Sequence, residues 1–213
     1  MRKRSSMSLE EHRLPRVLNV GSGPPGADDR FTAQFVSGGG WQVVRADVDP
    51  NVAPDVVASA TDLSALQSDS FDAAWCSHIL EHLFAHETET AARELFRVLK
   101  RGGTLFAFVP DVEAAARAVA SGGLTEPVYI SPAGPITPHD ILYGHGAAIA
   151  AGRTAMAHRS GFTPNRLGEA LHRAGFDPVV VQRTTEFEIQ AKATKPLGDW
   201  SPELGTYRDS PFA

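Results

Sequence analysis

From Val17 to Gly26 the chain reads Val-Leu-Asn-Val-Gly-Ser-Gly-Pro-Pro-Gly, a short apolar run joined directly to a glycine-rich turn. The run predicts a buried strand, and the letters of the turn match G-x-G-x-x-G. Asp47 ends the next apolar run, at about the spacing of an acid that binds a ribose. A strand, a glycine turn and a later acid together predict a nucleotide or nucleoside site.

Two prolines inside the turn narrow the class of ligand. Pro25 disfavours helical geometry at Pro24, so the helix that follows is predicted to begin near Asp28. Proline has no N–H, so the turn lacks two of the donors that would hold a diphosphate at a helix N-terminus. The turn therefore suits a nucleoside without a diphosphate better than a dinucleotide.

Strand and helix patterns alternate along the chain on both sides of this turn. Such alternation predicts an α/β fold, with a mostly parallel sheet and helices on both faces. Ligands of such sheets bind at the carboxyl ends of the strands. The last two strands are close enough in sequence to form an antiparallel pair. Strands are predicted at 17–20, 41–46, 56–57, 71–76, 104–109, 179–181 and 187–193, and helices at 29–36, 87–100 and 163–174.

Composition excludes several classes of protein. The 213 residues carry a net charge of −5, which argues against a general nucleic-acid binder. No stretch is long and apolar enough to span a bilayer, and no apolar segment of a secretory signal follows the basic residues near the N-terminus. Cys76 is the single cysteine, so neither an internal disulfide nor a CxxC metal site can form. These features predict a cytoplasmic protein.

Five motifs in order resemble those of class I S-adenosylmethionine-dependent methyltransferases of the type 11 kind. The resemblance covers about residues 16–110. It implies a Rossmann-like sheet of seven strands, mostly parallel with an antiparallel last strand, and S-adenosylmethionine as cofactor. The motifs are Val17-Leu-Asn-Val-Gly-Ser-Gly23, Asp47-Val-Asp-Pro50, Ala60-Thr-Asp-Leu63, Ser70-Phe-Asp-Ala-Ala-Trp-Cys-Ser-His-Ile-Leu-Glu-His-Leu83 and Glu94-Leu-Phe-Arg-Val-Leu-Lys-Arg-Gly-Gly103.

The resemblance also implies a role for each matching residue. Gly21 and Gly23 would let the backbone approach the methionine end of the cofactor, and Asp47 would accept both ribose hydroxyls. Asn19 departs from the pattern, since many members carry an acid there. Asp62 and the Leu63 backbone would hold the adenine, and residues 76–78 would pass the methionine and sulfonium. The full predicted cofactor set is Val20, Gly21, Ser22, Gly23, Asp47, Val48, Asp62, Leu63, Cys76, Ser77 and His78.

A proline- and glycine-rich insertion at 121–162 interrupts the alternation after the fifth strand. We predict that it is a lid over the acceptor, within a methyltransferase domain at 15–193 flanked by a flexible arm (1–14) and a tail (194–213). Methyl transfer needs positioning and, for some acceptors, removal of a proton. A small molecule with an O or N nucleophile is the first choice of acceptor, and a peptide or protein the second. Candidate catalytic residues in the insertion are His139, Tyr143, His145 and His158.

Three other functions stay open at this point. His78-Ile-Leu-Glu-His82 matches the H-x-x-E-H of inverted zincins, in which two histidines one helical turn apart bind zinc for a hydrolase. No residue is evident as a third ligand, so no metal ligand is predicted. The literal G-x-G-x-x-G allows an NAD-dependent oxidoreductase. A cofactor-binding scaffold without catalysis is the third alternative, because no general base can be assigned from the sequence alone.

Overall fold

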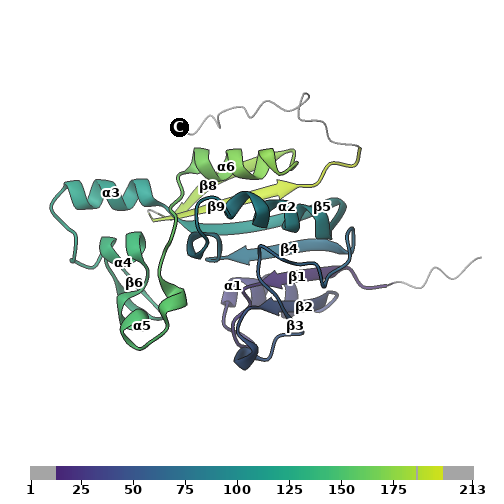
Figure 1. Ribbon diagram of the computed structural model, residues 1–213, viewed down its shortest axis with the longest axis horizontal. Helices are drawn as coiled ribbons and strands as arrows, with labels where there is room; N and C mark the ends of the chain where they lie inside the picture. Colours follow the sequence, from purple (N-terminus) through teal and green to yellow (C-terminus); the bar gives the residue numbers. More distant parts are fainter. Residues whose placement is uncertain (1–12, 186, 199–213) are drawn as a thin grey trace, which may run out of the picture.

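A seven-stranded sheet forms the centre of the protein, in the order β3-β2-β1-β4-β5-β9-β8 (Figure 1). The computed structural model describes residues 13–185 and 187–198. All neighbours pair in parallel except at β9, which runs antiparallel to both β5 and β8. This confirms the predicted sheet and its antiparallel last strand. The strands are β1 (Arg16–Val20), β2 (Gln42–Asp47), β3 (Val56–Val57), β4 (Phe71–Ser77), β5 (Leu99–Pro110), β8 (Val179–Thr185) and β9 (Glu188–Thr194).

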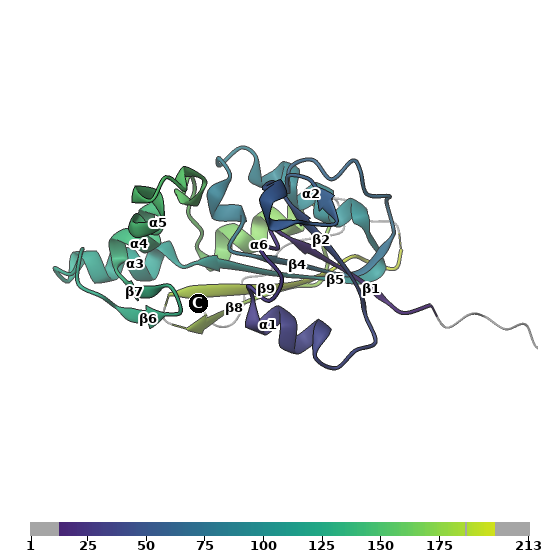
Figure 2. The same cartoon turned by 90° about the horizontal axis from the view of Figure 1, so that it is seen from below.

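Helices cover both faces of the sheet, as predicted (Figure 2). On one face, α2 (Thr88–Val98) and α6 (Pro164–Arg173) bury the apolar stripes expected from their sequence, including Leu95 and Leu171. On the other face, α1 (Asp29–Phe31) continues into a π-helical turn over 32–36. Phe31 and Phe35 from this segment pack on Trp75 of β4. Burial of these two apolar clusters is the main force that holds the layers together.

Caps set the beginnings of two helices where the sequence predicted them. The Asp28 carboxylate accepts the N–H groups of Arg30 and Phe31, so α1 begins after the two prolines. Thr163 caps α6, with Pro164 at its first position. Two strand boundaries differ by four residues or more. β5 begins at Leu99 rather than 104, because Leu99 already pairs with Phe71 before the ladder shifts register. β8 continues to Thr185 rather than ending at 181, because it stays paired with β9.

The 121–162 insertion is more regular than the sequence analysis predicted. A helix, α3 (Val112–Ala120), leads into a hairpin of β6 (Tyr129–Ser131) and β7 (Gly134–Ile136). Two short helices follow, α4 (Pro138–Tyr143) and α5 (Gly146–Ala150). Thr137 and Asp140 form a capping box at the start of α4, with Pro138 at its first position. The insertion lies beyond the carboxyl ends of the strands (Figure 1).

The ends of the predicted domain need one correction. Lys195, assigned to the tail at 194–213, is almost buried, and its ammonium donates to the Leu99 carbonyl and to the Asp69 carboxylate, both at 2.8 Å. Most of the predicted arm and tail, residues 1–12 and 199–213, lie outside the described residues. Within the described part of the chain, no helix is long and apolar enough to cross a membrane.

Candidate functional site

A cavity of about 840 Å³ opens where the strands end and the insertion begins. Its walls come from the glycine turn after β1, the end of β4, the first residues of β9 and the insertion. A volume of this size is typical of a small-molecule site. The cavity therefore joins the region expected to bind cofactor to the segment predicted as a lid.

The glycine turn is held by the end of β2. Gly23 N–H donates to Asp47 Oδ2 at 2.9 Å, and the Arg45 guanidinium donates to the Gly23 carbonyl. Gly21 and Gly23 both have positive φ, at 66° and 56°, which favours glycine. A Cβ at Gly21 would overlap the side chain of Ile79. The turn is thus tightly placed against the segment that follows β4.

Of the eleven predicted cofactor residues, five line the cavity; the described residues that line it do not include Val20, Asp47, Val48, Asp62, Leu63 and Cys76. Gly21, Ser22, Gly23, Ser77 and His78 line the cavity, together with Asn19. Val48 is 62% exposed, and Val20 and Cys76 are buried in the core. Burial raises the pKa of the Cys76 thiol, so the thiol stays neutral.

The backbone of Leu63 is hydrogen-bonded within the protein. Leu63 N–H donates to Glu94 at 2.8 Å, and the Leu63 carbonyl accepts from Arg97 at the same distance. The Leu63 N–H is therefore already engaged, its carbonyl keeps one lone pair, and the contact of this loop with the adenine stays a prediction. Hydrogen bonds from the side chain and from the N–H of Ser64 to the Asp62 carboxylate lower the pKa of Asp62.

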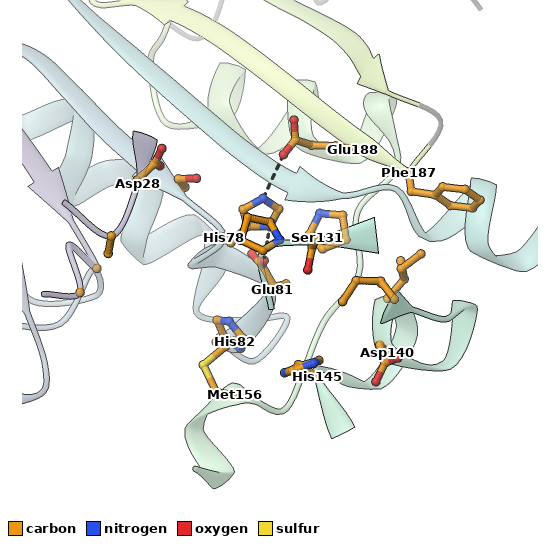
Figure 3. Close-up of a pocket in the computed structure, with 18 of the residues that line it drawn as sticks. Asp28, His78, Glu81, His82, Ser131, Asp140, His145, Met156, Phe187 and Glu188 are labelled. Atoms are coloured by element: carbon orange, nitrogen blue, oxygen red, sulfur yellow. Dashed lines mark hydrogen bonds and ion pairs between the residues drawn. The ribbon is translucent and has the colours of Figure 1, made fainter. Parts of the chain in front are cut away.

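Four charged side chains, Arg30, Glu188, His78 and Glu81, are linked in a row along the cavity wall, and Figure 3 labels the last three. Arg30 donates to Glu188 at 2.7 Å, and His78 lies between Glu188 and Glu81, with nitrogen–oxygen distances of 3.0 and 3.1 Å. Burial opposes a charge on His78, but its hydrogen bonds to Glu188 and Glu81 outweigh burial and raise its pKa to about 10. His78 is therefore protonated at neutral pH and acts as a donor, not as a base.

Glu188 interacts with both Arg30 and His78 and so links these two side chains. Burial favours its neutral form, but hydrogen bonds from His78, Arg30 and Thr184 prevail and lower its pKa to about 2. Glu81 follows the same pattern, since burial opposes its charge while His78 lowers its pKa. These carboxylates hold the His78 imidazolium at the end of β4, where its backbone has a φ of 54°.

We expect Glu188→Gln to lower the free energy of unfolding by on the order of 2 kcal/mol at pH 6. A depressed carboxyl pKa contributes stability above the unfolded-state value of about 4.5, and loses it as the pH falls toward about 2. The difference between the two proteins should therefore shrink from pH 5 to pH 2. Urea denaturation across that range measures it, and a difference independent of pH would contradict the ionised state of Glu188.

The H-x-x-E-H letters do not form the zincin geometry. Residues Leu80–His82 make a single 3-10 turn, and His78 turns toward Glu188. The zinc-hydrolase alternative, which needs His78 and His82 on one face of an α-helix, therefore lacks that helix. His82 instead lies against His158 of the insertion, with ring centroids 5.1 Å apart.

The four predicted catalytic residues of the insertion separate in space. His145 and His158 line the cavity. His139 and Tyr143 are exposed on α4, their rings 4.9 Å apart, and neither is among the described residues that line the cavity. Burial lowers the pKa of His158, so its ring is neutral at physiological pH.

Several cavity residues were not predicted from the sequence. Arg30, Tyr129, Met156 and Phe187 line the cavity. Glu188 lies in the strand predicted at 187–193 and was not assigned to the cofactor or catalytic set. The one sequence feature that could have pointed to Arg30 is its position just after Asp28, which caps α1. No local pattern marks Glu188, since its partner His78 is 110 residues away.

A family model described as a methyltransferase domain matches residues 18–107. No curated protein sequence matches the chain. Among solved structures, an S-adenosylmethionine-dependent methyltransferase from Methanosarcina mazei is 18% identical with a TM-score of 0.57; the alignment covers 87% of this chain and 95% of that one.

Two further similar structures have named acceptors. Phosphoethanolamine N-methyltransferase 2 from Haemonchus contortus, in complex with phosphomonomethylethanolamine and S-adenosylhomocysteine, is 13% identical with a TM-score of 0.53. The alignment covers 85% of this chain and 49% of that one, so this chain spans about half its length. The 1,6-didemethyltoxoflavin-N1-methyltransferase from Burkholderia thailandensis is 18% identical with a TM-score of 0.53, over 86% and 72% of the two chains. At these identities the likeness concerns the fold.

Proposed function

Residues 18–107 belong to the class I S-adenosylmethionine-dependent methyltransferases, and on this premise we propose that the chain methylates an oxygen or nitrogen nucleophile of a small molecule. One observation carries the proposal: the glycine turn and the insertion wall a single cavity of about 840 Å³. A cofactor against the turn and an acceptor against the insertion would then meet near Ser77 and His78 at the end of β4.

The residues present fit the cofactor. Asp47 stands at the carboxyl end of β2, and each of its oxygens accepts one backbone N–H, from Gly23 and from Asp49. Each oxygen keeps a second lone pair for a ribose hydroxyl. The two prolines of the turn leave little capacity for a diphosphate, which disfavours NAD. When bound, S-adenosylmethionine supplies a methyl group on a sulfonium that is already activated for displacement.

The protein would orient the reactants, exclude water from them and provide an acceptor for the proton. The insertion lies beyond the strand ends and would exclude water from the reacting atoms. His78 can donate a hydrogen bond but not remove a proton, because it is already protonated. His145 lines the same cavity, and we propose that it accepts the proton that the nucleophile loses as the new bond to the methyl carbon forms.

The lining of the acceptor half supports a small, partly apolar acceptor. Tyr129, Ile136, Met156 and Phe187 contribute ring and aliphatic surface there. A peptide or protein acceptor is the second choice. A scaffold without catalysis would bind cofactor but produce no S-adenosylhomocysteine with any acceptor.

Titration calorimetry with S-adenosylmethionine, S-adenosylhomocysteine and NAD tests the cofactor assignment. We expect the first two to bind one per chain and NAD to give no heat. Binding of NAD alone would overturn the proposal. Release of S-adenosylhomocysteine in the presence of small hydroxylated or amino compounds then separates an enzyme from a scaffold.

We expect His145→Ala to lower turnover by about 10²–10⁴-fold, the usual contribution of a general base. Cofactor affinity should change little, because His145 belongs to the insertion. His139→Ala is the matched control, since His139 lies on the neighbouring helix outside the lining and should leave turnover unchanged. Turnover rates with the best acceptor measure the first effect, and calorimetric affinities for S-adenosylmethionine measure the second. Equal losses of turnover and cofactor affinity would assign His145 a structural role.

A further inference from the structure

Glu81 carries a polar atom for which the protein provides no partner. Its side chain is almost completely buried in the 3-10 turn after β4. Oε1 accepts from His78 at 3.1 Å, whereas Oε2 is buried and has no hydrogen-bond partner among the described residues. This oxygen is therefore a desolvated acceptor that no described donor satisfies. Such an atom is costly unless something positive binds it.

Two histidines present lone pairs beside it. His82 Nδ1 lies 3.2 Å from the Ala157 carbonyl, and His158 Nδ1 lies 2.9 Å from the Ile141 carbonyl. A carbonyl only accepts, so each Nδ1 carries the proton. In the neutral ring Nε2 is then the unprotonated nitrogen. Metal-ligating histidines have this arrangement, with one nitrogen donating to a backbone carbonyl and the other free to coordinate.

The three groups converge on one point. One ligand atom each from Glu81, His82 and His158 lies within 4.8 Å of the other two. The His82 and His158 rings meet edge to face, at 66°, instead of stacking. All three residues line the cavity, so the cluster has a side that faces open space. A cation at this point would satisfy the unpartnered Glu81 oxygen and could take a lone pair from each of the two rings.

We propose that Glu81, His82 and His158 bind a divalent transition metal of the zinc class, with an open coordination position facing the cavity. Two imidazoles and one carboxylate are the ligands of several open zinc sites, whereas Mg²⁺ and Ca²⁺ take oxygen ligands. Tetrahedral zinc separates its nitrogen and oxygen ligands by about 3.4 Å, so binding would draw the three atoms together by at most roughly 1.4 Å.

The proposed set differs from the zincin reading of the same letters. In that reading His78 and His82 bind the metal and Glu81 acts as a base. Here His78 is held by two carboxylates, and the third ligand comes from the insertion, 76 residues beyond His82 in the chain. A metal at this point would also tie the insertion to the end of β4.

Titration of ZnCl₂ and of CoCl₂ into chelator-treated full-length protein tests the site without any cofactor or acceptor present. We expect one metal per chain and a visible Co²⁺ spectrum typical of tetrahedral coordination. His158→Ala and His82→Ala should each weaken Zn²⁺ binding by roughly a hundredfold or more, beyond the range seen for loss of an outer-shell partner. Glu81→Gln should do the same; if it does not fold, the two histidine variants carry the test.

Two controls make the outcome specific to the cluster. His139→Ala removes an exposed histidine of the insertion, and His145→Ala removes one that lines the cavity outside the cluster. Both should keep the wild-type affinity and Co²⁺ spectrum, with circular dichroism confirming the fold of every variant. Absence of stoichiometric metal in the wild type, or equal weakening by His145→Ala, would overturn the assignment. Because the readout is metal binding, it is independent of whether methyl transfer occurs.

Discussion

Asp47→Ala is expected to weaken S-adenosylmethionine binding by about 2–3 kcal/mol, the value of hydrogen bonds to a charged group. This corresponds to a loss of affinity of roughly 30- to 150-fold. The substitution removes both acceptors proposed for the ribose hydroxyls. It also removes the acceptor of the Gly23 N–H, so the turn against the methionine end loosens as well. Titration calorimetry of the two proteins gives the difference directly.

Asp49→Ala is the matched control for this substitution. Asp49 lies two residues further on, is exposed, and caps a short 3-10 turn by accepting the Asn51 N–H. Its removal should leave cofactor affinity unchanged within about twofold, because it costs only a surface cap. Unchanged affinity in Asp47→Ala, with the protein folded, would contradict the ribose assignment. Equal losses in both variants would point to a general disturbance of the loop.

Gly144→Ala is expected to disorganise the insertion, at a cost on the order of 3 kcal/mol in the free energy of unfolding. Gly144 has φ of 96° and ψ of 160°, a conformation that is nearly exclusive to glycine. A Cβ there would overlap the Met156 carbonyl oxygen. The residue forms a β-bridge with Ala157, which stands directly before His158. The substitution should therefore displace His145 and His158 together while the sheet stays folded.

Comparison with Gly152→Ala separates two costs in the free energy of unfolding, that of the steric overlap and that of backbone strain. Gly152 lies in the same insertion with φ of 90°, and a Cβ there would meet no atom within 4 Å. It should cost only about 1–2 kcal/mol. Denaturant unfolding measures both variants, and limited proteolysis reports whether cleavage concentrates within 121–162. Equal stability of the two variants would mean that the Gly144–Ala157 bridge does not hold the insertion in place.

Local signals predicted most of the sheet and its helices. Apolar runs ended by glycine, proline or aspartate marked the strands, and Thr163-Pro164 marked the start of α6. The same signal was present, but not used, at Thr137-Pro138, where Asp140 completes a capping box and begins α4. The insertion was thus more predictable than its proline content indicated, because a proline at the first helical position begins a helix and does not break it.

The candidate site was predicted less completely, and the reason lies in how it is assembled. The glycine turn and Asp47 are close in sequence and follow a recurrent strand–turn–helix pattern, so the sequence alone identified the cofactor side. The protonated state of His78 depends on Glu188, and the metal cluster depends on His158, which reaches Glu81 through the path of the insertion. These contacts follow from sheet register and from the packing of distant segments. The sequence by itself therefore determined the order of elements and the class of cofactor, whereas the tertiary structure alone decided which histidines are charged, which are neutral and which converge, because burial and neighbouring charge set the state of an ionisable group.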